Sequence, residues 1–143
     1  TMKTVELTRR FTFEMAHALR GYDGLCRNIH GHSYKLLVTV SGEPSTDPQD
    51  PKYGMVIDFS DLKQIVNSLI VDRLDHALVV REGGPTKALG ELDYRIVETK
   101  YQPTCENMVV DFAQQIAEHL PQGVRLTKVK LYETENSYAV FRP

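Results

Sequence analysis

The stretch HGHSYKLLVTV, residues 30–40, decides the fold, because apolar side chains recur in it at every second position. Four of them share one face of an extended chain: Tyr34, Leu36, Val38 and Val40. His30 and His32 precede them in the same parity. A period of two is typical of a strand with one buried face, so the stretch predicts a strand that carries two imidazoles at one end of that face.

An earlier stretch, residues 5–13, alternates in the same way and predicts another strand. Its apolar face is formed by Val5, Leu7, Phe11 and Phe13. His17 continues that parity beyond the predicted strand, and a glycine-containing loop separates it from His30. Two strands this close in the sequence can form a hairpin, which would carry His17 beside the other two histidines.

Two helices are predicted downstream of this hairpin. In residues 60–72 the apolar side chains have the spacing of an amphipathic helix, and Asp58 or Ser60 can cap its start. Thr104 can cap a second helix that runs to about residue 120. The side chains expected to face inward from this second helix are Val109, Phe112, Ala113, Ile116 and Leu120.

The rest of the chain predicts two irregular stretches and two more strands. Residues 42–54 and 83–90 are rich in proline or glycine and lack periodicity. Residues 124–133 and 137–142 are typical of strands joined by a short turn. The order strand, strand, helix, helix, strand, strand (ββααββ) predicts an α+β fold with a four-stranded antiparallel sheet and both helices on one face. Such a sheet has two open edges, which favours oligomerisation through the sheet.

The composition indicates one ordinary domain over residues 1–143. Hydrophobic residues make up 41% and charged residues 25%, which excludes a disordered chain. Because the net charge is -2 and no basic block occurs, we expect a small molecule as partner and neither nucleic acid nor a membrane. Neither an export signal nor an apolar run of about 20 residues is visible, so a cytoplasmic protein with two reduced cysteines is expected.

The candidate metal ligands are His17, His30 and His32. An isolated His-x-His pair is commonly two surface histidines, but here three of the five histidines of the chain converge. Three protein ligands with an open fourth position are typical of catalytic zinc, whereas a structural site would normally have a fourth Cys or His. Nitrogen ligands therefore favour Zn²⁺. His119 lies near a helix end and is assigned no role.

Cys26 lies four residues before His30, so its thiol can lie in the metal site as a ligand or as a base. A buried, inert cysteine is the alternative. Cys105 begins the second predicted helix, where the helix dipole could acidify it, and a passive role is expected.

Three acidic residues and one histidine complete the candidate set. Asp75–His76 pairs a carboxylate with an imidazole, as acid and base catalysis requires, although a capping Asp beside a surface His is the commoner outcome. Glu133 ends a predicted strand, and Glu106 lies in the first turn of the second helix. Both could equally be solvated acids, since a helix N-terminus favours Glu.

Five motifs in order make the sequence resemble the family of 6-pyruvoyltetrahydropterin synthases and their bacterial relatives, the 6-carboxytetrahydropterin synthases of queuosine biosynthesis. The motifs are FEMAH (13–17), CRNIHGH (26–32), LDH (74–76), PTCEN (103–107) and YET (132–134). They span nearly the whole chain. Two departures are Gln102, where relatives often have Asn, and a longer segment at residues 81–101.

The resemblance implies the tunnelling fold (T-fold), assembly as a homohexamer (a dimer of trimers) and active sites between subunits. The residues that it implies for the site fall into three groups by role: zinc ligands His17, His30 and His32; proton-transfer residues Cys26, Asp75 and His76; and pterin-binding residues Glu133, Thr104 and Glu106. A carboxylate suits the last role, because it can accept two parallel hydrogen bonds from an aminopyrimidine edge.

The implied substrate is 7,8-dihydroneopterin triphosphate, from which triphosphate leaves. Cleavage with release of acetaldehyde would give 6-carboxytetrahydropterin, whereas stopping at the diketone would give the pyruvoyl product. The gap between Cys26 and His30 resembles the bacterial queuosine branch, so the carboxy product is expected. Alternatives of other classes are a zinc- or pterin-binding module without turnover, and a zinc hydrolase that needs no thiol.

Overall fold

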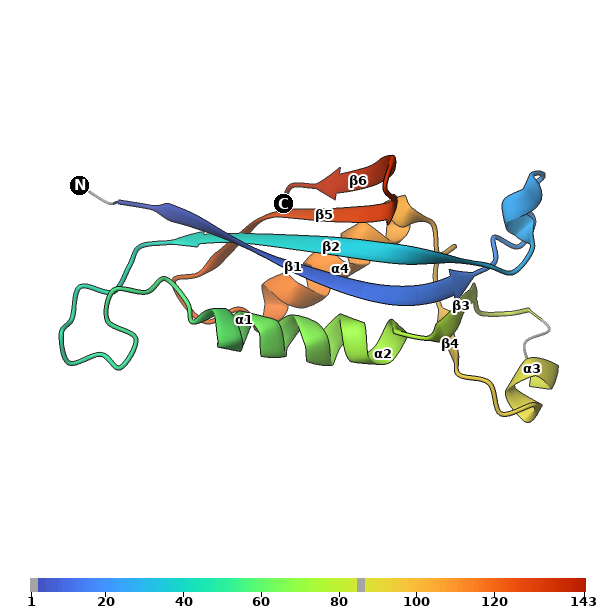
Figure 1. Ribbon diagram of the computed structural model, residues 1–143, viewed down its shortest axis with the longest axis horizontal. Coiled ribbons are helices and arrows are strands. Elements are labelled where there is room, and N and C mark those ends of the chain that lie inside the picture. Colours follow the sequence, from blue (N-terminus) through green and yellow to red (C-terminus); the bar gives the residue numbers. More distant parts are fainter. Residues whose placement is uncertain (1–2, 85–86) are drawn as a thin grey trace.

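Six strands form one curved sheet within residues 3–84 and 87–143, the part of the chain that the computed structural model describes (Figure 1). Their order across the sheet is β4-β3-β1-β2-β5-β6. The longest are β1 (Val5–His17) and β2 (His30–Gly42), which run along most of the molecule. The predicted α+β class is confirmed, but the predicted four-stranded sheet is wrong.

β1 and β2 form the predicted hairpin, paired antiparallel from Val5 opposite Gly42 to His17 opposite His30. β1 is longer than the sequence analysis expected, because its alternation of buried and exposed positions continues through Met15 to His17. The pairing that builds the buried face of the sheet therefore also sets His17 directly across from His30.

The two strands that the sequence analysis missed follow the first helix. β3 (Ala77–Arg81) runs parallel to β1, and β4 (Ile96–Thr99) runs parallel to β3, so the sheet is mixed and not purely antiparallel. Both strands are short, and β3 begins with four consecutive apolar residues without alternation, as buried parallel strands commonly do. Between them lies α3 (Lys87–Glu91). Residues 85–86 of the stretch predicted to be irregular lie outside the described residues.

The C-terminal hairpin is confirmed at the other edge of the sheet. β5 (Arg125–Thr134) pairs antiparallel with β2, and β6 (Ser137–Phe141) pairs antiparallel with β5. β5 carries Glu133 next to its last residue, at the same end of the sheet as the start of β2.

The first predicted helix is α1 (Phe59–Val66), which continues directly into a π-helical turn, η2 (Asn67–Val71), and then α2 (Asp72–Leu74). Asp58 caps it, since its carboxylate accepts a hydrogen bond from the backbone N–H of Ser60. His76 is the last residue before β3. Because β3 pairs with the end of β1, Asp75 and His76 lie beside that end of β1.

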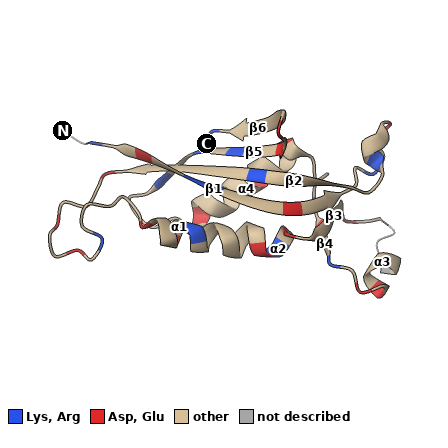
Figure 2. Cartoon of the chain, in the orientation of Figure 1, with Lys and Arg blue, Asp and Glu red and all other residues tan. Residues whose placement is uncertain are grey.

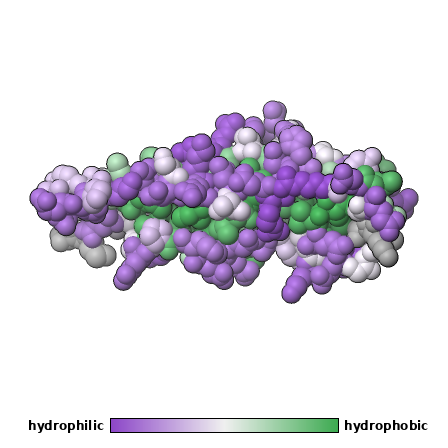
Figure 3. All heavy atoms as spheres, turned by 90° about the horizontal axis from the view of Figure 1, so that it is seen from below, coloured by the Kyte–Doolittle hydropathy of each residue, from purple (hydrophilic) through white to green (hydrophobic). Residues whose placement is uncertain are grey.

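The second predicted helix is α4 (Cys105–His119), and Thr104 caps it by accepting a hydrogen bond from Asn107 N. α1 and α4 pack on the same face of the sheet, where one apolar core joins them to the strands (Figure 1). Phe13 of β1 contributes to it by stacking on Tyr34 of β2, and it meets Phe112 of α4 edge-on. Seen from below, hydrophobic side chains show through between hydrophilic ones along the middle of the molecule (Figure 3).

Charged side chains of both signs are interspersed along the elements, without a block of one sign (Figure 2). Across the described ranges, none of the helices has the length and apolar character that a membrane crossing would need.

Candidate metal centre and active site

Three histidines from the β1–β2 hairpin converge at one end of the buried face of the sheet. His17 is the last residue of β1, and His30 and His32 open β2 with Gly31 between them, so both side chains of β2 point to the same face. One nitrogen of each ring lies within 4.8 Å of the others. The predicted convergence of the three rings is therefore present, and the three nitrogens could hold one metal ion.

The hydrogen bonds of these rings orient their free nitrogens toward each other. His17 Nδ1 lies 2.7 Å from the carbonyl oxygen of Pro103, and His30 Nδ1 lies 2.7 Å from that of Asn28. Since a carbonyl oxygen only accepts, Nδ1 of both rings carries the proton and Nε2 presents a lone pair. Carbonyl groups that fix the tautomer in this way are typical partners of metal-binding histidines.

The Nε2 atoms of His17, His30 and His32 are buried, and none has a hydrogen-bond partner among the described residues. Buried polar atoms are almost always paired, so three unpaired nitrogens at one point need an explanation. A cation held between them would supply one. The donor set thus fits a divalent metal that accepts imidazole nitrogen, zinc among them.

Burial lowers the pKa of His17 below its ordinary value of 6.5, against the opposing effect of the hydrogen bond to Pro103. Burial is also the main reason why the pKa of His32 is lowered, and Glu133 acts in the opposite direction. Both rings are therefore neutral near pH 7, which is the form that binds metals.

Glu133 lies beside this histidine cluster. Its Oε1 atom is 3.4 Å from His17 Nε2 and 3.6 Å from His32 Nε2, and its side chain is 28% exposed. The carboxylate therefore faces both the histidine nitrogens and solvent. A ligand that enters from solvent can contact the carboxylate and the metal site together.

The start of α4 lies next to the histidine cluster. Pro103 supplies the carbonyl to His17, and Thr104 uses its hydroxyl oxygen to cap the helix at Asn107. Cys105 is buried, donates its S–H to the Leu131 carbonyl at 3.2 Å, and burial raises its pKa to about 11. A thiol in this state is unreactive at neutral pH, in keeping with the passive role expected for Cys105.

Glu106 lies in the first turn of α4 and is exposed. Cys26 lies in η1 (Leu25–Arg27), a single 3-10 turn in the loop between β1 and β2, and is exposed as well. The group of mutually close ligand atoms found in the described ranges contains three histidines and no cysteine. The structure thus brings His17, His30, His32 and Glu133 together and leaves Cys26 on the surface of the loop.

Asp75 and His76 form the predicted carboxylate–imidazole pair at a second location. Asp75 Oδ2 lies 3.0 Å from His76 Nδ1, and Asp75 Oδ1 accepts a hydrogen bond of 2.8 Å from the backbone N–H of Glu14. That backbone bond is the main reason why the pKa of Asp75 is lowered, so the carboxylate is ionised at neutral pH. His76 is 76% exposed in the single chain.

The backbone of His76 has φ 62°, in the left-handed region that residues other than glycine rarely adopt. This conformation costs roughly 1–2 kcal/mol, so surrounding contacts must impose it. The bond from His76 N to the Glu14 carbonyl, 2.5 Å long, is one of them. Strain held at a predicted site residue is typical of functional sites.

A pocket of about 550 Å³ lies beside the Asp75–His76 pair, and of the histidine cluster only His32 is among the described residues that line it. His32 and His76 both line it, together with Glu14, Tyr94 and Arg95. Sequence reasoning identified the two histidines but missed Arg95, which lies in the segment between β3 and β4, and it missed the Pro103 and Asn28 carbonyls. Backbone oxygens leave no signal in residue types, so no pattern could have revealed the latter two.

Comparisons with known proteins identify the family of the chain. The 6-carboxy-5,6,7,8-tetrahydropterin synthase of Haemophilus influenzae is 35% identical over 142 residues, covering 96% of this chain and 98% of the relative. Human 6-pyruvoyl tetrahydrobiopterin synthase is 33% identical over 150 residues, covering 96% and 90%. The solved structure of Caenorhabditis elegans 6-pyruvoyl tetrahydropterin synthase superposes with a TM-score of 0.71 at 27% identity, covering 99% and 97%.

The family profile described as 6-pyruvoyl tetrahydropterin synthase matches residues 6–143, which include every site residue described above. The chain therefore belongs to the 6-pyruvoyl tetrahydropterin synthase family.

Proposed function

We propose that the protein is a zinc-dependent 6-carboxy-5,6,7,8-tetrahydropterin synthase of queuosine biosynthesis, which acts in the cytoplasm. It would convert 7,8-dihydroneopterin triphosphate and water to 6-carboxytetrahydropterin, acetaldehyde and triphosphate. The observation that carries the proposal is the convergence of three unpaired Nε2 atoms beside the Glu133 carboxylate, in a chain of this family. The carboxy product is supported by relatives of that name, at 35% and 28% identity in Haemophilus influenzae and Rickettsia bellii.

His17, His30 and His32 would hold the zinc ion through Nε2, with one coordination position left for the substrate. When bound, zinc supplies Lewis-acid chemistry to the hydroxyl oxygens of the pterin side chain. The chain's contribution is to keep the rings neutral and oriented, through burial of His17 and the carbonyls of Pro103 and Asn28.

Glu133 would anchor the pterin by accepting two parallel hydrogen bonds from its aminopyrimidine edge. Its partial exposure beside the histidines supports this role, because the ring and the side chain of one substrate could then be held at the same time. Thr104 and Glu106, at the start of α4, would line the same pocket.

Cys26 would remove a carbon-bound proton from the side chain, and His76, oriented by Asp75, would return protons. Cys26 is exposed on its loop, and His76 is exposed at the edge of the sheet. Such exposure supports an active site completed between subunits, in which the Asp75–His76 pair serves the cysteine of a neighbouring copy. A homohexamer, assembled as a dimer of trimers, would provide that neighbour.

The second candidate is 6-pyruvoyltetrahydropterin synthesis, favoured by the human relative at 33% identity. Both reactions start from the same substrate and need the same residues. They differ in whether a carbon–carbon bond breaks, so acetaldehyde is the discriminating product.

To test the proposal, zinc-loaded protein is incubated with 7,8-dihydroneopterin triphosphate, and the pterin mass and acetaldehyde are followed beside the Cys26→Ser variant. Acetaldehyde in equal amount to a 6-carboxy pterin, lost in the variant, is the expected result. A pyruvoyl pterin without acetaldehyde would move the protein to the second candidate. Full activity in Cys26→Ser would point to hydrolysis without a thiol, and unchanged substrate in both proteins would leave only a binding module.

A further inference from the structure

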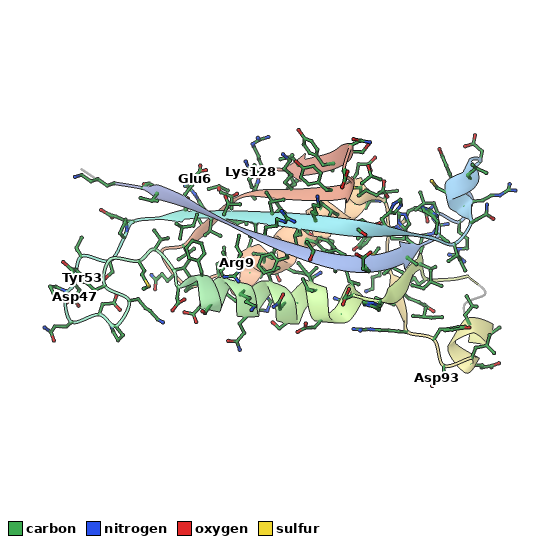
Figure 4. The ribbon with its side chains drawn as sticks, viewed as in Figure 1. Glu6, Arg9, Asp47, Tyr53, Asp93 and Lys128 are labelled. Atoms are coloured by element: carbon green, nitrogen blue, oxygen red, sulfur yellow. The ribbon has the colours of Figure 1, made fainter. Side chains whose placement is uncertain are left out.

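Just before β4 begins, the side chain of Arg95 reaches the end of α2. The chain between β3 and β4 passes through α3 and then reverses at Asp93, whose φ of 63° is left-handed, at the outer tip of this segment (Figure 4). The carbonyl of Arg95 then accepts a hydrogen bond of 2.9 Å from Leu78 N in β3. The backbone of Arg95 is thereby fixed to the sheet, and its side chain reaches the residues at the end of α2.

The guanidinium of Arg95 bridges two backbone carbonyls at this helix end. Nη1 donates to the Asp75 carbonyl at 3.0 Å, and Nη2 donates to the Asp72 carbonyl. The last carbonyls of a helix have no partner within the helix, and a cation there also interacts favourably with the helix dipole. Arg95 therefore caps the helix end with its side chain and fixes the backbone just before His76.

β1 holds the backbone at Asp75–His76, called the Asp75–His76 corner below, from the other side. Glu14 donates its N–H to Asp75 Oδ1 at 2.8 Å, and the Glu14 carbonyl accepts from His76 N at 2.5 Å. Between these two anchors lies the left-handed backbone of His76, with its imidazole 3.0 Å from Asp75. Removing either the Arg95 or the Glu14 hydrogen bonds should allow the His76 backbone to relax toward an ordinary conformation.

We propose that Arg95 is a positioning residue for the reaction: its hydrogen bonds to the Asp72 and Asp75 carbonyls fix the direction in which the His76 side chain points in the pocket. The inference rests on the proposed role of the Asp75–His76 pair. Its support is that Arg95, His76 and His32 line one cavity, although Arg95 belongs to a segment with no recognised motif. The segment between β3 and β4 would thus be part of the active site's framework and not a surface decoration.

Arg20 offers a matched control, because it makes the same kind of contact elsewhere. Its Nη2 donates to the carbonyls of Arg81 and Glu82, both at 2.9 Å, and so ties the end of β3 to the loop after β1. Arg20→Ala removes a guanidinium that bridges two backbone carbonyls, but it leaves the Asp75–His76 corner intact. A general loss of stability would appear in both variants.

The test compares Arg95→Ala, Arg95→Lys, Arg20→Ala and His76→Ala in zinc-loaded protein. Steady-state kinetics are measured with 7,8-dihydroneopterin triphosphate, and His76 is observed by ¹H–¹³C NMR of histidine-labelled protein, with His76→Ala assigning the signal. We expect kcat of Arg95→Ala to fall about 10- to 100-fold with KM and zinc content unchanged, as for a misplaced catalytic group. The His76 signal should shift or broaden, and methylguanidinium should restore part of kcat.

Arg95→Lys should recover part of kcat, since an ammonium can reach one carbonyl but not bridge two. Arg20→Ala should keep kcat and the His76 signal. An unchanged His76 signal in Arg95→Ala would overturn the inference, whatever the activity, and so would equal losses of kcat in Arg95→Ala and Arg20→Ala. A shifted signal combined with a fully active His76→Ala would support the placement by Arg95 and refute the proposed role of His76.

Discussion

His17 Nδ1 lies 2.7 Å from the carbonyl oxygen of Pro103, a residue 86 positions further along the chain. This bond joins the last residue of β1 to the residue that precedes the cap of α4. The orientation of the His17 ring, a proposed metal ligand, therefore depends on the packing of α4 against the sheet as well as on the hairpin. Variants that disturb the start of α4 should consequently affect the metal site as well as the fold.

Replacing one of the converging histidines should abolish tight metal binding. In His32→Ala two nitrogens remain, which is too few for a stable zinc site, so the metal content should fall from about one ion per chain to a small fraction of that. Atomic absorption after exhaustive dialysis measures it.

The control for this measurement is His119→Ala, because His119 lies in the last turn of α4, where its ring hydrogen-bonds the Gln115 carbonyl, and it is not part of the histidine cluster. It should retain the full metal content. Equal metal content in His32→Ala and the unaltered protein would show that the cluster is not the metal site.

Removal of the metal should lower thermal stability, because an ion that binds only the folded state stabilises it by mass action. At a metal concentration about 100-fold above the dissociation constant the gain is about 2.7 kcal/mol, which corresponds to a Tm shift of roughly 5–10 °C for a domain of this size. Calorimetry with and without a chelator measures the shift. If His32→Ala shows the same shift, the stabilising ion binds elsewhere.

Thr104→Ala should destabilise the protein by about 1 kcal/mol, because it removes the cap hydrogen bond to Asn107 N at the start of α4. Thr104→Ser keeps the hydroxyl and should restore most of this stability. Urea unfolding of the metal-free proteins measures both. The proposed contact of Thr104 with the pterin would appear separately, as a higher KM in Thr104→Ala; a stability equal to that of the unaltered protein would contradict the capping role.

The two cysteines should differ sharply in reactivity. Cys26 is exposed, whereas Cys105 is buried with its pKa raised to about 11. In native protein at pH 8 a thiol reagent should therefore label one cysteine quickly and the second only after denaturation, with Cys26→Ser identifying the first. Labelling of both at one rate would contradict the buried position of Cys105.

The raised pKa of Cys105 also sets a pH dependence. A thiol in the unfolded chain ionises near its ordinary pKa of 9.0, while the folded one stays protonated to about pH 11. Between these values the unfolded state binds fewer protons, so stability falls as pH rises through that window. Cys105→Ala should flatten this part of the curve of unfolding free energy against pH; a curve as steep as that of the unaltered protein would contradict the assignment.

Glu133→Gln should weaken substrate binding while leaving the metal in place. A hydrogen bond to a charged group contributes about 1.5–3 kcal/mol, so KM should rise roughly 10- to 100-fold. The position of Glu133 beside His17 would allow it to be either a pterin anchor or a metal ligand. Zinc content, measured in the same preparation, distinguishes these two roles. Loss of the metal with an unchanged KM would make Glu133 a ligand instead of a pterin anchor.

The histidine cluster could be predicted from the sequence because it depends on strand parity. Once His17, His30 and His32 are placed on the inner face of two adjacent strands, antiparallel pairing brings them together. The helix caps were also accessible, because capping is local: Asp58 was one of two candidates for the first helix, beside Ser60, and Thr104 was predicted for the second.

β3 and β4 could not be predicted in the same way. β3 pairs with β1 over only three residue pairs, from Met15 opposite Ala77 to His17 opposite Val79, and its parallel pairing follows a crossover that no local signal reveals. The position of Arg95 depends on that pairing, because Leu78 holds its backbone. Contacts decided by tertiary structure were therefore invisible, whereas those decided by periodicity were not.

The pairing of His17 with His30 has a consequence for the loop between them. These residues flank the segment 18–29, which carries Cys26, so an ion bound to both would act as a cross-link where that segment begins and ends. Closing a loop costs conformational entropy. Here the strand pairing and the bound ion together would offset that cost, because both hold the two histidines close to each other. Loading the metal should thus narrow the volume that the Cys26 thiol explores.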